Sequence, residues 1–527
     1  MNKGQRTKDK GQIIWLLFAL VIIFIYFFGL SIPLVGPDEP RYAQVAREMY
    51  LRGDWITPTL GGFDWFEKPA LLYWLQIASY KIFGVSEFAA RFGSALFGLG
   101  TILALWILGS LATENTENHR EIEDGKTSSE NSVSSVAKKD FANWLALIAA
   151  SSIGLLAFSR GASFDIILTF PITAALVAFF IFDQSTKKSG FTFYLLTFTF
   201  YFLIGVALIA KGLVGIVFPF AIVAFYYLLS RKLPSKIFVF SLIWGTILSL
   251  LIASVWYLPM YQANGWKFVD EFIIQHHFQR YTSNKYLHPQ PFWFFFLVLP
   301  LMTLPWLPFF LASIWEFIKL QSERFKVNNS EKLSTLDSQL STFAFAWLLV
   351  PLVFFSLSGS KLPGYILPSL PAALILTAIY VFKFAEKSRT RRRALQILAF
   401  STFALIFVIL QFFTADFTKP ETVKNMIETI DAKGFADKKI VNLFAVSHNL
   451  EFYAAGRLIR ETDGKLKRYD DFSVLVRELE NAPGKQILVA VSQEVVPSLI
   501  ENSLSAKVEV LAENGETAIV SVKSPNF

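Results

Sequence analysis

The chain has 527 residues, of which 54% are hydrophobic and 17% charged, and it contains 55 Phe and 13 Trp. This composition differs from that of an average soluble domain and is typical of a protein that crosses a membrane several times. We interpret the net charge of +8 as a feature of membrane topology and expect no nucleic acid as a partner. Cysteine is absent, which excludes disulfide frameworks, thiolate nucleophiles and thiolate zinc sites.

Eleven apolar runs follow one another along the chain, and most are long enough to cross a hydrocarbon core of ~30 Å as a helix. The sequence therefore predicts an α-helical polytopic membrane protein with about 11 or more transmembrane helices, in a domain that covers residues 1–413. The runs lie near residues 13–35, 89–112, 141–158, 163–182, 192–210, 213–230, 237–258, 292–318, 342–358, 365–382 and 395–413.

The distribution of Lys and Arg predicts the orientation of these helices. The N-terminus and every second connecting segment carry 23 Lys and Arg residues, against 11 in the alternate segments before residue 414. Because cytoplasmic segments carry the excess of positive charge, the N-terminus is placed in the cytoplasm. Two long segments, 36–88 and 259–291, and everything from residue 414 onward are then expected on the outer face.

Residues 414–527 have a different composition and predict a small soluble α/β domain. The stretches "KKIVNLFAV", "QILVAVSQ", "KVEVLAEN" and "ETAIVSVK" are typical of strands, and "DFSVLVRELENA" has helical periodicity. "ENGE" at 513–516 favours a tight hairpin turn, because Asn514 and Gly515 tolerate positive φ.

The first outer segment begins with "DEPRYAQVAREMYLRG", which predicts a short helix in the membrane interface. Asp38 stands where an N-cap belongs, Pro40 falls in the first turn, and Gly53 is placed to end the helix. Asp38 is therefore either a helix cap or a functional carboxylate. The face expected to be polar and accessible carries Arg41, Gln44, Glu48 and Arg52.

Further along this segment, "DWFEKPALLYWLQ" predicts a second helix that starts near Pro69. The backbone before a proline is extended, so Glu67 and Lys68 would lie at the helix entrance. They are either a plain surface pair or part of a site, and the aromatic residues around them suit a membrane-interface belt.

Other polar residues stand out against their apolar surroundings. Asp165 in "SRGASFDIILTF" is costly inside an apolar run unless it is paired or lines a water-filled cavity, so it is a candidate for function. His277 and Arg280 share one helical face, although a single histidine is usually structural. Lys361 and Tyr365 fall in a short turn between two spans, where a snorkelling lysine is the simpler interpretation.

In combination these motifs resemble a known family. "DEPRYAQVAREMYLRGDWITPTLGGFDWFEKPALLYWLQ", "FGVSEFAARF", "HHFQRY" with "QPFWFF", and "GSKLPGYILPSLP" are similar to segments of bacterial lipid A aminoarabinose transferases and of the protein O-mannosyltransferase superfamily. The resemblance spans approximately residues 10–385. It implies an integral-membrane glycosyltransferase of the GT-C type, which takes a sugar from a polyprenyl phosphate. The family position of Pro40 is often Thr or Ala, and proline suits the first turn of a helix.

The resemblance also implies roles for individual residues. Asp38 is the leading catalytic carboxylate and Asp165 the second acidic position. Donor-binding residues are expected because the departing phosphate develops negative charge that cations stabilise. A Glu67–His277 pair would offer oxygen and imidazole ligands to a divalent metal ion, and no other cofactor is expected. The donor-binding set comprises Arg41, Tyr42, Lys68, Arg280, Lys361 and Tyr365.

The expected activity is transfer of a sugar from a polyprenyl-phosphate donor to a lipid A, glycolipid or protein acceptor. It would take place at the outer face of the bacterial cytoplasmic membrane, with membrane lipid as the surrounding partner. The alternative is a transporter or flippase of polyprenyl-linked sugars, which would place polar groups near the bilayer midplane and often contain inverted repeats. Here the charged candidates gather on one face and no repeat is visible, which favours transfer.

Overall fold

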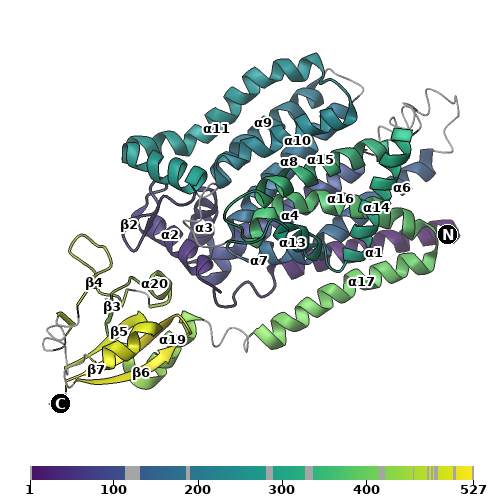
Figure 1. Cartoon of the computed structure of the whole chain (residues 1–527). Helices are drawn as coiled ribbons and strands as arrows, with labels where there is room; N and C mark the ends of the chain where they lie inside the picture. Colours follow the sequence, from purple (N-terminus) through teal and green to yellow (C-terminus); the bar gives the residue numbers. More distant parts are fainter. Residues whose placement is uncertain are drawn as a thin grey trace. The chain divides into compact units, whose positions relative to one another are not determined.

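A computed structural model describes residues 3–112, 131–185, 190–279, 289–326, 336–414, 422–454, 456–471, 474–475, 479, 485–501 and 506–524 (Figure 1). The chain forms two compact units. The first comprises Met1–Phe28, Glu67–Leu72 and Phe92–Phe407, and the second Gly29–Phe66, Tyr73–Arg91 and Val408–Phe527. The second unit thus combines the C-terminal residues with most of the first outer segment.

The first unit is a bundle of helices. Helix α4 (Glu87–Ala112) begins in the second unit, and the π-helix η4 (Ile409–Phe413), which follows the last helix of the bundle, belongs to the second unit. The others are α1 (Lys3–Phe27), α6 (Asn131–Ser151), α7 (Ile153–Arg160), α8 (Phe164–Gln184), α9 (Phe191–Lys211), α10 (Val214–Ser230), α11 (Lys236–Phe268), the π-helix η1 (Val269–Gln279), α13 (Phe294–Met302), α14 (Leu307–Lys326), α15 (Leu336–Ser356), the 3₁₀ helix η3 (Pro363–Ser369), α16 (Leu370–Glu386) and α17 (Arg389–Val408).

By length and composition, seven helices among the described residues could cross a membrane, and nine could if each of two bent pairs is one span. Two shorter apolar helices, Ile13–Phe27 and Val214–Ser230, coincide with the remaining predicted runs. The protein is therefore a polytopic membrane protein as expected, while the count of 11 or more spans stays a prediction.

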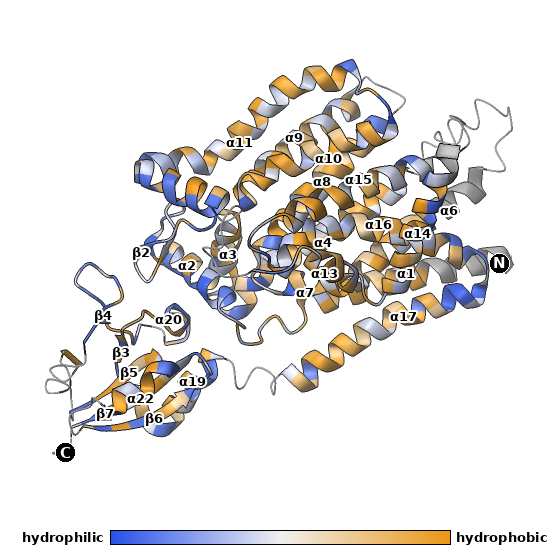
Figure 2. Ribbon diagram, viewed as in Figure 1, coloured by the Kyte–Doolittle hydropathy of each residue, from blue (hydrophilic) through white to orange (hydrophobic). Residues whose placement is uncertain are grey.

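Figure 2 shows that apolar residues cover most of the length of these helices. The most buried spans are α8 and the span formed by η3 and α16, in which 78% and 83% of the most apolar stretch is buried. The corresponding values are 28% for the span that contains α11 and 17% for the span that contains α17. Since lipid is as apolar as a protein core, the exposed apolar faces of α11 and α17 suit contact with acyl chains.

Two of the runs predicted as single helices are broken. The helices on either side of Ser152 are bent by 59°, and α13 and α14 by 117°. Pro305 lies in the second break and cannot donate a backbone hydrogen bond. The N–H of Ile153 donates to the carbonyl oxygen of Leu304 at 2.8 Å, so the two breaks satisfy each other's backbone groups.

The C-terminal part of the second unit is a five-stranded sheet with the order β4-β3-β5-β7-β6. The pairs β3–β4 and β3–β5 are parallel, whereas β5–β7 and β6–β7 are antiparallel. All four strands expected from the sequence are present, and Gly515 takes a φ of 88° in the predicted hairpin turn. The helix expected at 471–482 lies largely outside the described residues. The strands are β3 (Ile440–Leu443), β4 (Arg468–Tyr469), β5 (Gln486–Ser492), β6 (Lys507–Glu513) and β7 (Thr517–Lys523).

Apolar side chains cover both faces of this sheet. Ile440 and Leu488 belong to one buried cluster, together with residues of α19 (Val423–Ile430) and α20 (His448–Ala454). Val441 and Val489 belong to the other, with residues of α22 (Val496–Glu501). The remaining short elements are the π-helix η5 (Asp431–Phe435) and the 3₁₀ helix η7 (Gln493–Val495).

The outer-segment part of the second unit starts with helix α2 (Asp38–Arg52). Pro40 lies in its first turn and Gly53 ends it with a φ of 66°, as predicted. The short antiparallel pair β1 (Thr59–Leu60) and β2 (Phe63–Asp64) follows, and then α3 (Leu71–Phe83), which begins in the first unit. The prediction of an accessible polar face is wrong for Gln44 and Glu48. These side chains are 3% and 8% exposed, and the amide of Gln44 donates a hydrogen bond to the carboxylate of Glu48.

Candidate functional site

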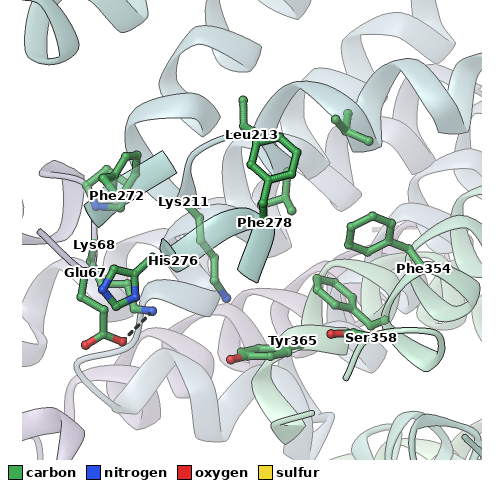
Figure 3. A pocket seen from close by; sticks show the side chains of 14 residues that line it. Glu67, Lys68, Lys211, Leu213, Phe272, His276, Phe278, Phe354, Ser358 and Tyr365 are labelled. Atoms are coloured by element: carbon green, nitrogen blue, oxygen red, sulfur yellow. Dashed lines mark ion pairs between the residues drawn. The ribbon is translucent and has the colours of Figure 1, made fainter. Parts of the chain in front are cut away.

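A pocket of about 380 Å³ lies in the first unit and is shown in Figure 3. Its volume falls in the range of roughly 300–1,000 Å³ that small-molecule sites occupy. Most of its wall is aliphatic or aromatic, with a few polar groups among them. The lining residues are Glu67, Lys68, Pro69, Lys211, Leu213, Val214, Val217, Phe272, His276, Phe278, Phe354, Phe355, Ser358 and Tyr365.

Asp165 and Lys211 form an ion pair beside this pocket. Asp165 lies in the first turn of α8, where Ser163 caps the helix by accepting a hydrogen bond from the Asp165 N–H at 3.1 Å. Lys211 is the last residue of α9. An acid at a helix N-terminus and a base at a C-terminus both interact favourably with the helix dipoles. The two side chains are 18% and 16% exposed, so the costly carboxylate expected from the sequence has its partner.

The "KLPGY" turn packs directly against this pair. A Cβ atom at Gly364 would lie 1.9 Å from Oδ2 of Asp165, so only glycine leaves room for the carboxylate. The ammonium of Lys211 lies 5.0 Å from the ring centre of Tyr365, within cation–π range. Lys361 is buried and donates to the carbonyl oxygen of Ser358, which itself lines the pocket. Tyr365 therefore contacts the site directly, and Lys361 reaches it through the backbone.

Glu67 and Lys68 enter the pocket from the start of the segment that leads into α3. Their side-chain atoms Oε1 and Nζ are 3.3 Å apart, and they are 15% and 12% exposed, so they are not a plain surface pair. Figure 3 shows His276 beside them. His276 comes from η1, the element that also contains the backbone of His277; the side chain of His277, and Arg280 as a whole, lie outside the described residues.

The described residues do not by themselves form a metal site. Glu67 and His276 offer one carboxylate and one imidazole, and no group of three His, Asp or Glu side chains gathers in the described part of the chain. Zinc in proteins usually has three or four protein ligands. The metal hypothesis for Glu67 and His277 stays a prediction.

Asp38 lies in the second unit, at the start of α2. Pro37 occupies the N-cap position and no side-chain hydrogen bond caps the helix, so the interpretation of Asp38 as an N-cap is wrong. Its carboxylate is 57% exposed and lies 3.6 Å from the guanidinium of Arg41, which stacks over Trp65 at 5.5 Å. Tyr42 is only 7% exposed. The carboxylate of Asp38 is thus accessible and lies close to the cationic side chain of Arg41.

A buried arginine holds the chain immediately before this carboxylate. The Arg91 guanidinium, 2% exposed, donates to both carboxylate oxygens of Glu39 at 3.0 and 2.6 Å and to the carbonyl oxygen of Leu30 at 2.9 Å. It also donates to the carbonyl oxygens of Ile32 and Pro33. A guanidinium whose fork is saturated in this way fixes the backbone that leads into α2.

Sequence reasoning missed Lys211, Gly364, His276 and Arg91. A lysine that directly follows an apolar run, as in "ALIAKG", was the available signal for Lys211, and the glycine of "KLPGY" was the signal for Gly364. Arg91 lies in "FAARFG", where a charge among apolar residues indicates a buried partner. Nothing local distinguishes His276 from His277.

Fold and pocket together define a polytopic membrane protein whose apolar pocket contains two paired lysines. The comparisons with known proteins make this class more specific. Residues 13–116 match the dolichyl-phosphate-mannose-protein mannosyltransferase family. Two curated relatives are undecaprenyl phosphate-alpha-4-amino-4-deoxy-L-arabinose arabinosyl transferases. The one from Aeromonas salmonicida is 29% identical over 68% of this chain and 59% of its own length, and that from Yersinia enterocolitica is 30% identical over 71% and 60%.

The structures agree with these sequence relationships. The chain superposes on ArnT from Cupriavidus metallidurans, solved in complex with undecaprenyl phosphate, with a TM-score of 0.73 at 21% identity, over 96% of this chain and 97% of ArnT. The expected resemblance to GT-C lipid A aminoarabinose transferases is confirmed, and this chain has the fold of ArnT. The chain thus spans only 59% and 60% of the length of the two curated relatives.

Proposed function

We propose that this protein is a glycosyltransferase that moves a sugar from a polyprenyl-phosphate donor to an acceptor on lipid A, another glycolipid or a protein. The observation that carries the proposal is the pocket of the first unit, in which Lys68 and Lys211 lie among mostly apolar walls. A polyprenyl phosphate has the matching chemistry, because its phosphate requires cations and its isoprenoid chain an apolar surface. The names of the curated relatives and the ligand of ArnT agree with this donor class.

The residues have separate roles in the proposed reaction. The bond between the anomeric carbon and the donor phosphate breaks, a bond to the acceptor oxygen forms, and polyprenyl phosphate leaves. Lys68 and Lys211 stabilise the negative charge that develops on the phosphate. Asp165 holds Lys211 in place, and Gly364 leaves the space for that contact.

The family resemblance implies that Asp38 is the leading catalytic carboxylate, and we propose that it acts on the acceptor. An acceptor hydroxyl must lose a proton as it attacks, and Asp38 would accept it as a general base. An acceptor phosphate is already ionised and needs orientation alone. Arg41 lies close enough to Asp38 to orient the carboxylate.

We further propose that the protein lies in the bacterial cytoplasmic membrane with Asp38 and the C-terminal residues on the outer face. The excess of Lys and Arg in the N-terminus and in the connecting segments assigned to the cytoplasm supports this orientation. A transporter or flippase is not favoured, because the relatives of known activity are transferases and no repeat is visible in the sequence.

The decisive test is transfer by the purified full chain in nanodiscs, with undecaprenyl-phosphate sugars as donors and lipid A or envelope glycoprotein as acceptor. Mass spectrometry of lipid A and envelope glycoproteins from cells with and without the gene then identifies the acceptor. A transferase adds a fixed sugar mass that disappears with the gene. Movement of the intact donor across a liposome membrane without any glycosylated product would identify a flippase instead.

The metal hypothesis has its own measurement. Elemental analysis of the purified protein should give close to one equivalent of a divalent ion in the wild type and much less in Glu67→Gln or His277→Gln. Equal metal content in all three proteins would refute a site shared by these residues. His276→Gln tests whether the neighbouring histidine is the imidazole ligand.

A further inference from the structure

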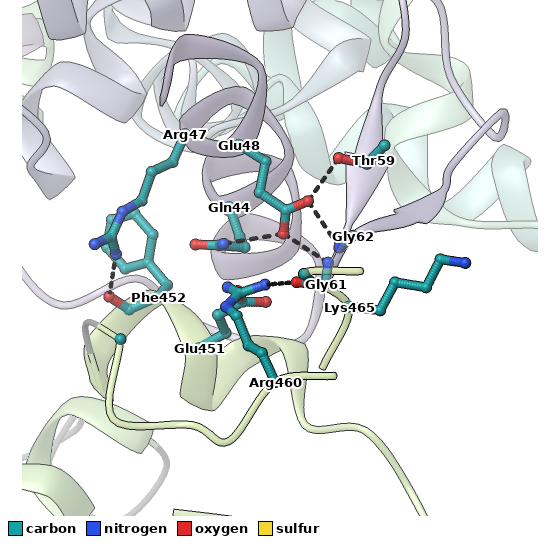
Figure 4. Close-up of polar contacts among 12 residues, drawn as sticks. Gln44, Arg47, Glu48, Thr59, Gly61, Gly62, Glu451, Phe452, Arg460 and Lys465 are labelled. Atoms are coloured by element: carbon teal, nitrogen blue, oxygen red, sulfur yellow. Dashed lines mark hydrogen bonds and ion pairs between the residues drawn. The ribbon is translucent and has the colours of Figure 1, made fainter. Parts of the chain in front are cut away.

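Helix α20 of the C-terminal part bonds directly to the backbone and side chains around α2. The hydroxyl of Tyr453 accepts a hydrogen bond from the Leu34 N–H at 2.7 Å. The guanidinium of Arg47 donates to the carbonyl oxygen of Phe452 at 3.0 Å, as Figure 4 shows. Leu34 precedes Asp38 in the chain and Arg47 follows it. Adjacent residues of α20 therefore hold the chain on both sides of Asp38.

A second connection runs through the β1–β2 turn. Glu48 of α2, 8% exposed, accepts hydrogen bonds from the N–H groups of Gly61 and Gly62 at 2.6 and 3.0 Å and from the hydroxyl of Thr59 at 2.6 Å (Figure 4). The other side of the turn bonds to the C-terminal part, where the N–H of Leu466 donates to the carbonyl oxygen of Gly61 at 2.9 Å. A buried carboxylate with several donors is a rigid link, because losing any one leaves a polar group unsatisfied.

The two parts approach so closely at this turn that side chains are excluded. A Cβ atom at Gly61, which has a φ of 64°, would lie 2.7 Å from Cε1 of His448. A Cβ atom at Gly62 would lie 2.9 Å from Cα of Lys465. Gly53 has almost the same φ, 66°, but nothing lies within 4 Å of its Cβ position. A comparison of substitutions at Gly61 and Gly53 therefore separates the effect of close packing from the effect of backbone strain.

We propose that helix α20 and the 460–466 turn fix the conformation of residues 34–62, so that the C-terminal domain positions Asp38 for the acceptor and is a working part of the transferase. This inference rests on the proposed function for its catalytic meaning. Tyr453, Glu48 and Gly61 are positioning residues in it, since they act through the segment that carries Asp38. The donor pocket belongs to the first unit, so donor binding should not depend on them.

The test compares Gly61→Ala with Gly53→Ala in the full chain in nanodiscs. Both alanines bear the strain of positive φ, but only Gly61→Ala pushes against His448. We expect Gly61→Ala to lower kcat at least tenfold, to leave the Kd for undecaprenyl phosphate unchanged, and to speed hydrogen exchange in α20. Gly53→Ala should keep kcat within threefold of the wild type and leave exchange in α20 unchanged.

Tyr453→Phe provides a second variant, which keeps the ring and removes only the hydroxyl that accepts the hydrogen bond from the Leu34 N–H. It should reproduce the loss of kcat to a smaller degree, again with unchanged donor affinity. Faster hydrogen exchange in α20 together with a wild-type kcat in both Gly61→Ala and Tyr453→Phe would overturn the positioning role. Equal losses of kcat in Gly61→Ala and Gly53→Ala would also overturn it. A wild-type protein without transferase activity would refute the proposed function, whereas docking of α20 is judged by hydrogen exchange alone.

Discussion

Replacement of Lys211 by methionine gives the sharpest test of the donor pocket, because this lysine was found from the structure and pairs with Asp165. A hydrogen bond to a charged group contributes about 1.5–3 kcal/mol. At ~1.4 kcal/mol for each factor of ten, Lys211→Met should weaken undecaprenyl phosphate binding by roughly 10- to 150-fold. Methionine keeps the length and apolar character of the side chain, so the packing against Tyr365 changes little.

The same substitution leaves the carboxylate of Asp165 without its cation. Removal of one partner from a fully buried pair costs ~3–5 kcal/mol, and the 18% exposure of Asp165 places the expected loss at or below the lower end of that range. In Asp165→Asn/Lys211→Met the isolated charge is gone, so most of the stability should return. Donor affinity should remain low, because the cation is still missing.

Native mass spectrometry of the variants purified in detergent micelles gives the donor affinity. Thermal unfolding in the same micelles gives the stability. Lys319→Met, an exposed lysine on α14, serves as the matched control and should change neither. Binding within twofold of wild type in Lys211→Met would refute the assignment. Recovery of full donor affinity in the double variant would show that Lys211 only neutralises Asp165.

Four further expectations follow from other parts of the chain. Asp38→Asn should abolish transfer with normal expression and insertion, and transfer near the wild-type rate would end its catalytic assignment. Lys68→Ala should raise the donor Kd by tenfold or more. Lys68→Arg should raise it by less, because arginine keeps the charge but changes the geometry. Equal donor affinity in the wild type and both variants would make Lys68 a structural residue. Burial and a nearby guanidinium lower the pKa of His448 from 6.5 to about 4. The contribution of the neutral imidazole to the free energy of unfolding should therefore be fully present above pH 6.5 and should fall by at most ~3 kcal/mol towards pH 4. In unfolding experiments at several pH values, His448→Gln should flatten this dependence. An impermeant thiol reagent added to intact cells should label Asp470→Cys and not Ser388→Cys, and the reverse pattern would invert the topology.

The positions of the spans could be predicted because lipid imposes a single local requirement, an apolar run of sufficient length. The breaks at Ser152 and before Leu307 could not. At these breaks the N–H of Ile153 donates to the carbonyl oxygen of Leu304, and these two residues are far apart in the sequence. Proline marks only one of the two breaks.

Candidate site residues could be recognised from the sequence where their own burial is costly, but not where a partner decides their environment. Asp165 was recognisable because a carboxylate in an apolar run requires compensation. Its partner Lys211 was not, because a lysine at the end of a span is equally suited to snorkelling. Glu48 was misassigned for a related reason: a polar helix face can meet backbone N–H groups of a turn as well as headgroups, and periodicity does not distinguish them.

The pairing of both pocket lysines has a consequence for the proposed reaction. Lys68 lies beside Glu67 and Lys211 beside Asp165, so each ammonium is oriented by a carboxylate before any donor arrives. An incoming phosphate then shares these cations with the carboxylates. The shared arrangement binds the polyprenyl phosphate product less tightly than two lone lysines would, and because the product retains the phosphate and the lipid chain of the donor, weaker ground-state binding favours turnover. On this reasoning Glu67→Gln should tighten product binding while lowering kcat, a combination that a purely structural glutamate would not produce.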